Sequence, residues 1–308
     1  GSDNVSGIAG IQAPAGWTVS NVGDNTFNFK KKGEEKTFLF KVNAASGAAD
    51  GQLAPFARIG DKQYAMRLIT IKYDHIPQQS VLQPAKVHAS RADVRVSARN
   101  IGYYMGAGDD IPAALRQIGC TVTLLEDKDL DAEKLAKFDA VVLGVRAYDT
   151  KDQLIFHQPA LFEYVQKGGT LVTQYNNSFS SDGTSLAPYP LKLSRQRVTD
   201  ETADIRMLLP EHPVLNGPNK LTAADFSGWV QERGLYYPSE WDANFSAPLS
   251  MNDPDEKALD GALLVAPYGQ GQFVYTGISF FRQLPAGVPG AYRLFANLIS
   301  LGKAGVKP

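Results

Sequence analysis

Short runs of alternating apolar and polar residues fill the first part of the chain. Such runs are Thr26–Lys30, Thr37–Val42 and Tyr64–Tyr73, and charged or turn-forming residues separate them. Alternation with a period of two is typical of strands that bury one face. Several short strands at this spacing predict a small all-β sandwich over residues 1–92.

The aromatic residues of these runs have two interpretations. Alternation favours a role in the sandwich core, and a platform for a sugar ring is the alternative; the residues are Trp17, Phe27, Phe29, Phe38 and Phe40. Prolines punctuate the exit from the sandwich at Pro77 and Pro84. Because proline restricts itself and its predecessor to extended backbone, the pair predicts a stiff connection over residues 75–84.

From residue 94 the pattern changes to apolar strands separated by single helices. The expected strands are Asn100–Tyr104, Cys120–Leu125, Phe138–Gly144 and Thr170–Gln174, and the expected helices start near Pro112, Asp131, Gln158 and Pro289. One helix between two strands requires a crossover and therefore parallel pairing. Residues 93–308 are thus predicted to form a doubly wound, flavodoxin-like α/β domain. A late hairpin over 263–276 and an irregular insertion around 176–260 complete it.

In such sheets ligands bind beyond the carboxyl ends of the strands, here at loops 105–110, 145–150, 175–180 and 277–282. The first loop lacks the third glycine of a dinucleotide fingerprint and carries Asp109-Asp110, so we expect no phosphate there. The candidate ligand-binding residues at the other loops and in the insertion are Arg146, Tyr148, Asp149, Asn176, Asn177, Glu232, Arg233 and Arg282.

Three interpretations of this polar cluster stay open. Arginine beside carboxylates and amides suits a carbohydrate or carboxylate ligand. The same residues would equally form a buried ion-pair network that holds the insertion to the sheet. A hydrolase site built on Arg146, Asp149 and Glu232 is the third interpretation, and a role in protein–protein assembly would instead require an exposed apolar patch.

Composition removes several function classes. Lys plus Arg total 31 and Asp plus Glu total 32, so the net charge of −1 argues against nucleic acid as a partner. Cys120 is the single cysteine, and the four histidines have no metal-ligand spacing, so neither a disulfide nor a metal or other cofactor is expected. No apolar run approaches the ~20 residues that span a bilayer.

Val141–Gly144 followed by Glu163–Val172 resembles the class I glutamine amidotransferase-like fold. In that family a nucleophilic cysteine occupies the turn after the fourth strand, and a histidine with an acid follows a late strand. Here Tyr175 stands near the cysteine position, and Gly277–Phe281 contains no histidine. We therefore expect Cys120 to be a buried apolar residue and expect no glutaminase chemistry.

The chain as a whole resembles the C-terminal region behind the catalytic domain of Bacteroidetes-type PIG-L (LmbE-like) deacetylases. The matching segments are Tyr73–Pro77, Gly144–Tyr148, Trp229–Tyr236 and Ser279–Arg293. The N-terminal sandwich is similar to Ig-like modules of glycan-active enzymes. The resemblance implies an upstream zinc-dependent N-acetylglucosaminyl deacetylase domain, a glycan ligand and a secreted or periplasmic protein.

The zinc motif of that family is absent from this sequence. His212-Pro213 continues into Val214-Leu215 without the carboxylates that the motif requires. We therefore expect no catalytic residue in this chain and interpret it as an accessory region. Gly1-Ser2 is interpreted as a remnant of cloning.

Overall fold

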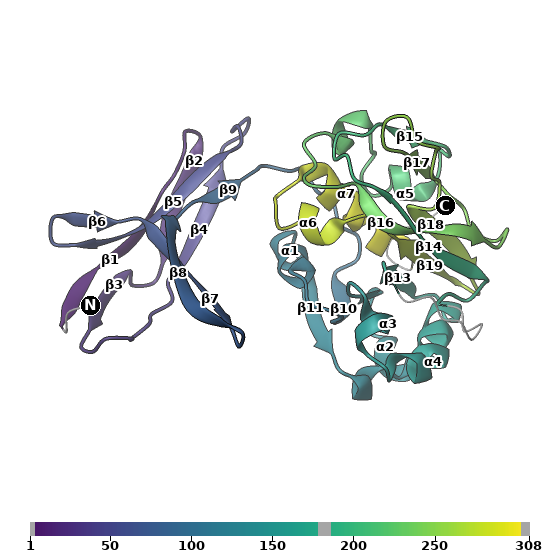
Figure 1. Ribbon diagram of the computed structural model, residues 1–308, viewed down its shortest axis with the longest axis horizontal. Coiled ribbons are helices and arrows are strands. Elements are labelled where there is room, and N and C mark those ends of the chain that lie inside the picture. The colour runs from purple at the N-terminus through teal and green to yellow at the C-terminus, as the bar shows by residue number, and fades with distance from the viewer. Residues whose placement is uncertain (1–3, 178–185, 303–308) are drawn as a thin grey trace. The chain divides into compact units, whose positions relative to one another are not determined.

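The computed structural model describes residues 4–177 and 186–302, and the chain divides into two compact units, Gly1–Arg91 and Ala92–Pro308 (Figure 1). Positions 178–180 of the predicted rim loop, and Gly1-Ser2, lie outside the described residues.

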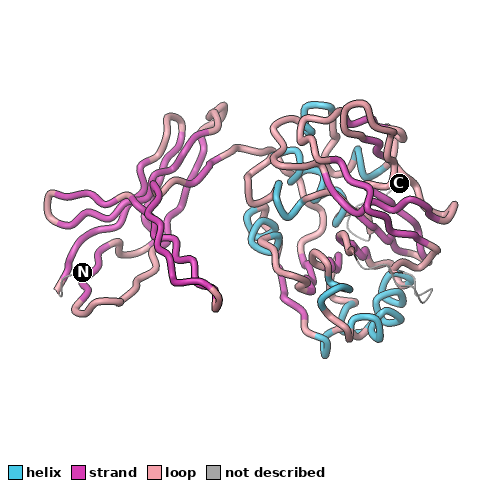
Figure 2. Tube along the Cα trace, viewed as in Figure 1, coloured by secondary structure: helices cyan, strands magenta, loops and turns pink. Residues whose placement is uncertain are grey.

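The described part of the first unit consists of strands and loops (Figure 2). The strands are β1 (Val5–Gln12), β2 (Trp17–Val22), β3 (Thr26–Phe29), β4 (Leu39–Ala44), β5 (Gly51–Ile59), β6 (Lys62–Tyr64), β7 (Met66–Tyr73), β8 (Ile76–Pro84) and β9 (Val87–Ala89). One sheet has the order β3-β1-β5-β6, with β9 also paired to β5, while β2–β4 and β7–β8 form two-stranded ribbons. All of these pairs are antiparallel.

Residues 76–84 are extended, as the prolines predict, but they form strand β8 and not a connection. Pairs such as Leu68↔Leu82 and Ile69↔Val81 join β8 to β7. Proline is tolerated because each strand of a two-stranded ribbon has an unpaired edge, where the missing N–H costs no ladder bond. The ribbon exposes Leu68 and Leu82 at 62% and 63% of their surface.

The predicted aromatic core of the first unit is only partly buried. Phe27 is buried and stacks on Phe29 with ring centroids 5.0 Å apart, while Trp17, Phe29, Phe38 and Phe40 are half-buried. These aromatics therefore pack on the unit rather than stand as a free sugar platform.

The second unit alternates strands and helices. Its strands are β10 (Asn100–Tyr104), β11 (Thr121–Leu125), β12 (Ala140–Leu143), β13 (Thr170–Gln174), β14 (Leu191–Val198), β15 (Ile205–Met207), β16 (Gly234–Trp241), β17 (Leu249–Met251), β18 (Leu263–Tyr268) and β19 (Gly271–Thr276). Its helices are α1 (Ile111–Gln117), α2 (Ala132–Leu135), α3 (Ala147–Thr150), α4 (Leu154–Gln166), α5 (Pro213–Asn216), α6 (Phe280–Gln283) and α7 (Pro289–Ile299), with 3-10 turns η1 (Asp127–Asp129) and η2 (Ala223–Phe226).

The main sheet of this unit has the order β11-β10-β12-β13-β19-β18. Its pairs are parallel except for the β18–β19 hairpin at one edge. Alternate strand residues belong to two separate cores: Ile101 and Val142 pack with α1 and α7, whereas Val141 and Leu143 pack with α2 and α4. Helices thus cover both faces, which confirms the predicted α/β class. Helix α4 begins one turn before the expected start.

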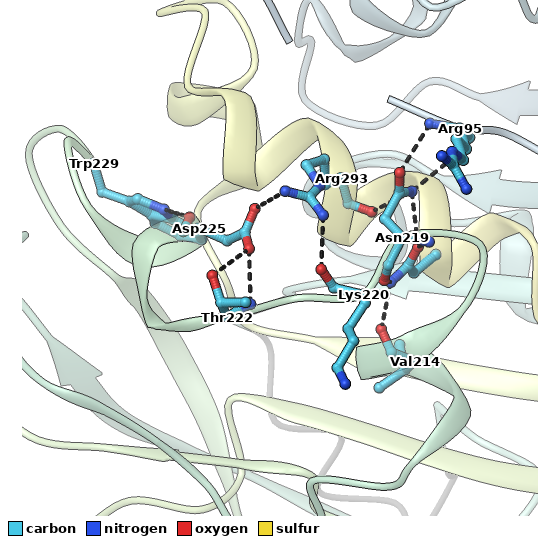
Figure 3. Close-up of polar contacts among 9 residues, drawn as sticks. Arg95, Val214, Asn219, Lys220, Thr222, Asp225, Trp229 and Arg293 are labelled. Atoms are coloured by element: carbon cyan, nitrogen blue, oxygen red, sulfur yellow. Dashed lines mark hydrogen bonds and ion pairs between the residues drawn. The ribbon is translucent and has the colours of Figure 1, made fainter. Parts of the chain in front are cut away.

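The insertion forms two further antiparallel pairs, β14–β16 and β15–β17. At the start of β16, Leu235 N–H donates to Gly277 O at 2.9 Å, so this strand reaches the carboxyl end of β19. Another part of the insertion packs on α7, where Asp225 pairs with Arg293 at 2.9 Å and Asn219 hydrogen-bonds Arg95 (Figure 3).

Candidate functional site

The turn between β12 and α3 places Arg146 at the carboxyl rim of the sheet. Arg146 has φ 58°, a left-handed conformation that non-glycine residues rarely adopt. Its N–H donates to Tyr175 O at 2.8 Å, which ties this turn to the residue that follows β13. Gln231 and Tyr236 in the insertion are also left-handed, with φ of 65° and 54°. Each such residue costs about 1–3 kcal/mol, and they concentrate at ligand sites.

Asp149 is the anchor of this rim. Its side chain is only 2% exposed, accepts from Arg146 Nε at 3.2 Å and accepts from Asn177 N–H at 2.8 Å. Beside it, Asn176 Oδ1 accepts from Tyr148 N–H at 2.9 Å. The structure therefore brings together five of the predicted site residues, and Asp149 with Asn176 locks the two rim turns to each other.

Tyr148 takes part in the rim through its backbone N–H, and its phenol is directed elsewhere. Its hydroxyl meets Gln158 Nε2 at 3.4 Å, inside the protein, and burial raises the pKa of Tyr148 to about 12. The Tyr148 side chain is therefore part of the packing beneath the rim.

Tyr175 lies at the centre of the rim, directly after β13. Its ring stacks on Tyr236 with centroids 5.8 Å apart and an interplanar angle of 12°, and Phe281 packs against it at 5.6 Å. The Tyr175 hydroxyl makes no hydrogen bond to a residue within 4–177 or 186–302. Burial raises the pKa of Tyr175, and the charges of Arg146 and Arg282 oppose that rise.

Glu232 and Arg282 complete the group from the insertion and from α6. Arg282 Nε donates to Glu232 Oε1 at 2.7 Å, and Arg282 Nη1 donates to Gln231 Oε1. The guanidinium also lies over the Phe281 ring at 4.8 Å. Both arginines lie near Tyr175, because Arg146 N–H bonds the Tyr175 carbonyl and the Arg282 guanidinium lies over Phe281, which packs on the Tyr175 ring.

Arg233 does not join the cluster, contrary to its place among the predicted ligand residues. Its guanidinium is directed to backbone carbonyls, Ala203 O at 2.7 Å and Phe226 O at 2.6 Å, and lies over the Trp229 ring. Arg233 is only 4% exposed, and burial lowers its pKa. Glu232 and Arg233 are consecutive in the chain but have separate partners, Arg282 for Glu232 and backbone carbonyls for Arg233.

A polar group beneath the rim escaped the sequence analysis. Tyr103 donates its hydroxyl to Asp109 at 2.7 Å, and Gln174 Nε2 donates to the same Tyr103 oxygen at 3.1 Å. Asp109 also accepts from Val145 N–H at 3.3 Å, which steadies the Arg146 turn. Burial raises the pKa of Asp109. The only sequence signal was an acidic residue in the loop after the first strand of the sheet.

Cys120 and His212 lie away from Tyr175. Cys120 immediately precedes β11, at the amino edge of the sheet, where it is buried and its thiol meets Ala98 O at 3.6 Å. Burial raises the pKa of Cys120 to about 11. His212 Nδ1 accepts from Val214 N–H at 3.2 Å. In the described ranges there is no group of three or more His, Cys, Asp or Glu residues that could hold a metal ion.

No described helix has the length and apolar composition to span a bilayer. No family model matches the sequence, and no curated protein matches it.

Solved structures give several matches of low identity. A GMP synthase-type protein from Thermoplasma acidophilum is 10% identical, with TM-score 0.43, covering 66% of this chain and 94% of that one. A ThuA-like protein from Bacteroides uniformis is 13% identical, with TM-score 0.42, covering 70% of this chain and 96% of its own. A cold-adapted β-galactosidase from Rahnella sp. R3 is 15% identical, with TM-score 0.38, covering 68% of this chain and 32% of its own.

The fold assignment itself rests on the strand order and on the two helical layers described above.

Proposed function

We propose that this chain is a non-catalytic, glycan-binding accessory region of a PIG-L-like N-acetylglucosaminyl deacetylase. The zinc-dependent domain lies upstream in the same polypeptide, the first unit is an Ig-like module, and the protein is secreted or periplasmic. The resemblance over Gly144–Tyr148, Trp229–Tyr236 and Ser279–Arg293 supports this proposal. Each of these segments contributes a residue to the rim around Tyr175.

The observation that carries the proposal is the Tyr175 hydroxyl, which bonds to no residue that the structure describes, on a rim that also holds Arg146 and Arg282. Tyr175 occupies the turn where the related fold has its nucleophile, but burial raises the pKa of Tyr175, so its hydroxyl stays neutral and serves as a hydrogen-bonding group. Tyr236 stacks on its ring, and Phe281 packs against the ring at an angle of 46°. A ligand therefore meets the polar edge of this cluster. Hydroxyl-rich ligands such as sugars are recognised through a few fixed polar groups of this kind.

Binding is favoured over hydrolysis by the state of the two carboxylates. Asp149 is buried and engaged by Arg146 and Asn177, and Glu232 pairs with Arg282. A general acid or base must reach the proton that it transfers on the substrate. Both carboxyl groups instead orient arginines, Asp149 for Arg146 and Glu232 for Arg282, as expected of a site that binds a ligand without reacting with it.

Isothermal titration of the chain with a panel of neutral and acidic saccharides, N-acetylated ones included, tests the proposal. Tyr175→Phe keeps the ring and removes the hydroxyl, and we expect about a tenfold loss of affinity, equivalent to the ~1.4 kcal/mol of a hydrogen bond to ligand. Tyr292→Phe is the matched control, because Tyr292 is equally exposed at 8% and its hydroxyl bonds Gln117. Absence of any saccharide binding would remove the proposed function.

An assembly module remains the second candidate because the β7–β8 ribbon exposes apolar side chains. Met66, Leu68 and Leu82 are each more than half exposed. Sedimentation velocity of the chain over a concentration series tests self-association. A dimer that disappears with Leu68→Ser and Leu82→Ser supports this candidate, and a monomer at all concentrations removes self-association through the ribbon.

A further inference from the structure

We infer, building on the proposed function, that the ligand of the Tyr175 rim is an acidic saccharide whose carboxylate or phosphate binds Arg146 and Arg282. Both arginines have N–H donors that the described residues leave unused. Arg146 uses Nε for Asp149, and its two terminal nitrogens make no hydrogen bond to a residue that the structure describes. Arg282 uses Nε for Glu232 and Nη1 for Gln231, which leaves Nη2 without a bond inside the same described ranges.

In this cluster the positively charged side chains are more exposed than the negatively charged ones. The side chains of Arg146 and Arg282 are 39% and 36% exposed, whereas those of Asp149 and Glu232 are 2% and 15% exposed. Each carboxylate thus lies behind its arginine and binds the Nε side, while the guanidinium faces outward. Although the four charges sum to zero, a ligand approaching the rim meets the two cations first.

The guanidinium geometry selects the kind of anion. A guanidinium presents parallel N–H groups that match two oxygens of a carboxylate or phosphate. The anchoring bonds to Asp149 and Glu232 restrict the side-chain rotations that binding would otherwise have to freeze. Tyr175, whose carbonyl accepts from Arg146 N–H and whose ring contacts Phe281 beneath Arg282, supplies its hydroxyl as a further donor for a third oxygen. A neutral sugar has no group that satisfies these donors equally well.

Backbone strain at the same residues supports a site prepared before binding. Arg146 and Gln231 both adopt left-handed backbone. Arg146 is itself one of the two arginines, and Gln231 accepts a hydrogen bond from the other, Arg282. The 2.8 Å bond from Arg146 N–H to Tyr175 O holds the first turn in place.

The test compares matched pairs of ligands by isothermal titration of the whole chain. The pairs are N-acetylglucosamine with its 6-phosphate, and glucose with glucuronate. We expect the acidic member of at least one pair to bind at least tenfold more tightly, and more weakly as NaCl increases. The pair that shows the difference identifies phosphate or carboxylate as the natural group.

Variants then assign the effect to the two arginines. Arg146→Gln and Arg282→Gln should each weaken the acidic ligand about tenfold, and Arg146→Lys should restore only part of the loss because it keeps the charge without the planar fork. Arg116→Gln is the control, since this exposed arginine lies at the C-terminal end of α1, at the amino edge of the sheet. Circular dichroism checks that each variant is folded.

The outcomes separate the two proposals. Equal binding of neutral and acidic partners, or acidic binding that both glutamine variants leave unchanged, overturns the acidic ligand while the glycan-binding function stands. No binding of any saccharide overturns both. Tight acidic binding lost in both arginine variants supports both.

Discussion

Replacement of Asn219 by alanine should destabilise the second unit by about 3 kcal/mol. Asn219 is 3% exposed and joins three segments that are distant in sequence (Figure 3). Its side chain accepts from Arg95 N–H at 2.8 Å and donates to Arg95 O at 2.8 Å. It also donates to Asn297 Oδ1 at 2.9 Å and, more weakly, to Arg293 O at 3.4 Å on α7.

The magnitude follows from these contacts. An intramolecular hydrogen bond contributes about 1 kcal/mol net, and an abandoned buried partner costs more. Three short bonds disappear, while Asn297 Oδ1 keeps the Asn219 backbone N–H at 2.9 Å, so the loss stays near about 3 kcal/mol. The assay is urea unfolding followed by tryptophan fluorescence, with Trp229 buried close to the network through its bond to Asp225 O at 3.0 Å.

Asn244→Ala is the control for this measurement. Asn244 is exposed and, among the residues that the structure describes, its side chain bonds Asp242, two residues away, so we expect a change below about 0.5 kcal/mol. The urea midpoint should shift with an unchanged m-value, which shows that stability and not the extent of unfolding has changed. A loss below about 1 kcal/mol for Asn219→Ala would refute the claim that this side chain holds the insertion to α7.

Three further predictions use urea unfolding as well. The pKa of Asp109 in the folded protein lies above its ordinary 3.8, so the free energy of unfolding should decrease as the pH rises from 3.8 through the raised pKa. Asp109→Asn should abolish this dependence of the free energy of unfolding on pH. Gly106→Ala should cost about 1–3 kcal/mol, since a Cβ would stand 2.1 Å from Val145 O; a neutral result would mean that the two loops separate easily. Leu143→Ala, at a fully buried position, should cost about 2–5 kcal/mol, whereas Leu68→Ala should change stability by less than about 0.5; equal effects would contradict the assigned burial.

Periodicity found most of the second unit. The runs at 100–104 and 170–174 became β10 and β13 without any change of bounds. Their apolar residues, such as Ile101 and Val172, are buried, as expected of strands covered on both faces. Helix α4 started earlier than expected, since Pro159 is accommodated inside it. Strand β8 was missed because the sequence shows the prolines but not whether their strand has an unpaired edge, where a proline does not interrupt the pairing.

The site was found in part. Arg146, Asp149 and Asn177 follow strand ends that must share one rim, so their proximity followed from the topology. The exclusion of Arg233 and the central place of Tyr175 did not follow. Both depend on which way an irregular segment turns, and left-handed residues at Gln231 and Tyr236 leave no periodic signal.

The sequence alone determined the alternation of strands and helices, the parallel sheet and the rim at which polar loops meet, because these follow from local periodicity and crossover geometry. Only the tertiary structure decided that two carboxylates lie behind two outward-facing arginines, around a tyrosine hydroxyl with no hydrogen-bond partner among the described residues. Depth within a fold depends on contacts between residues far apart in the chain, and a one-dimensional pattern carries no measure of it.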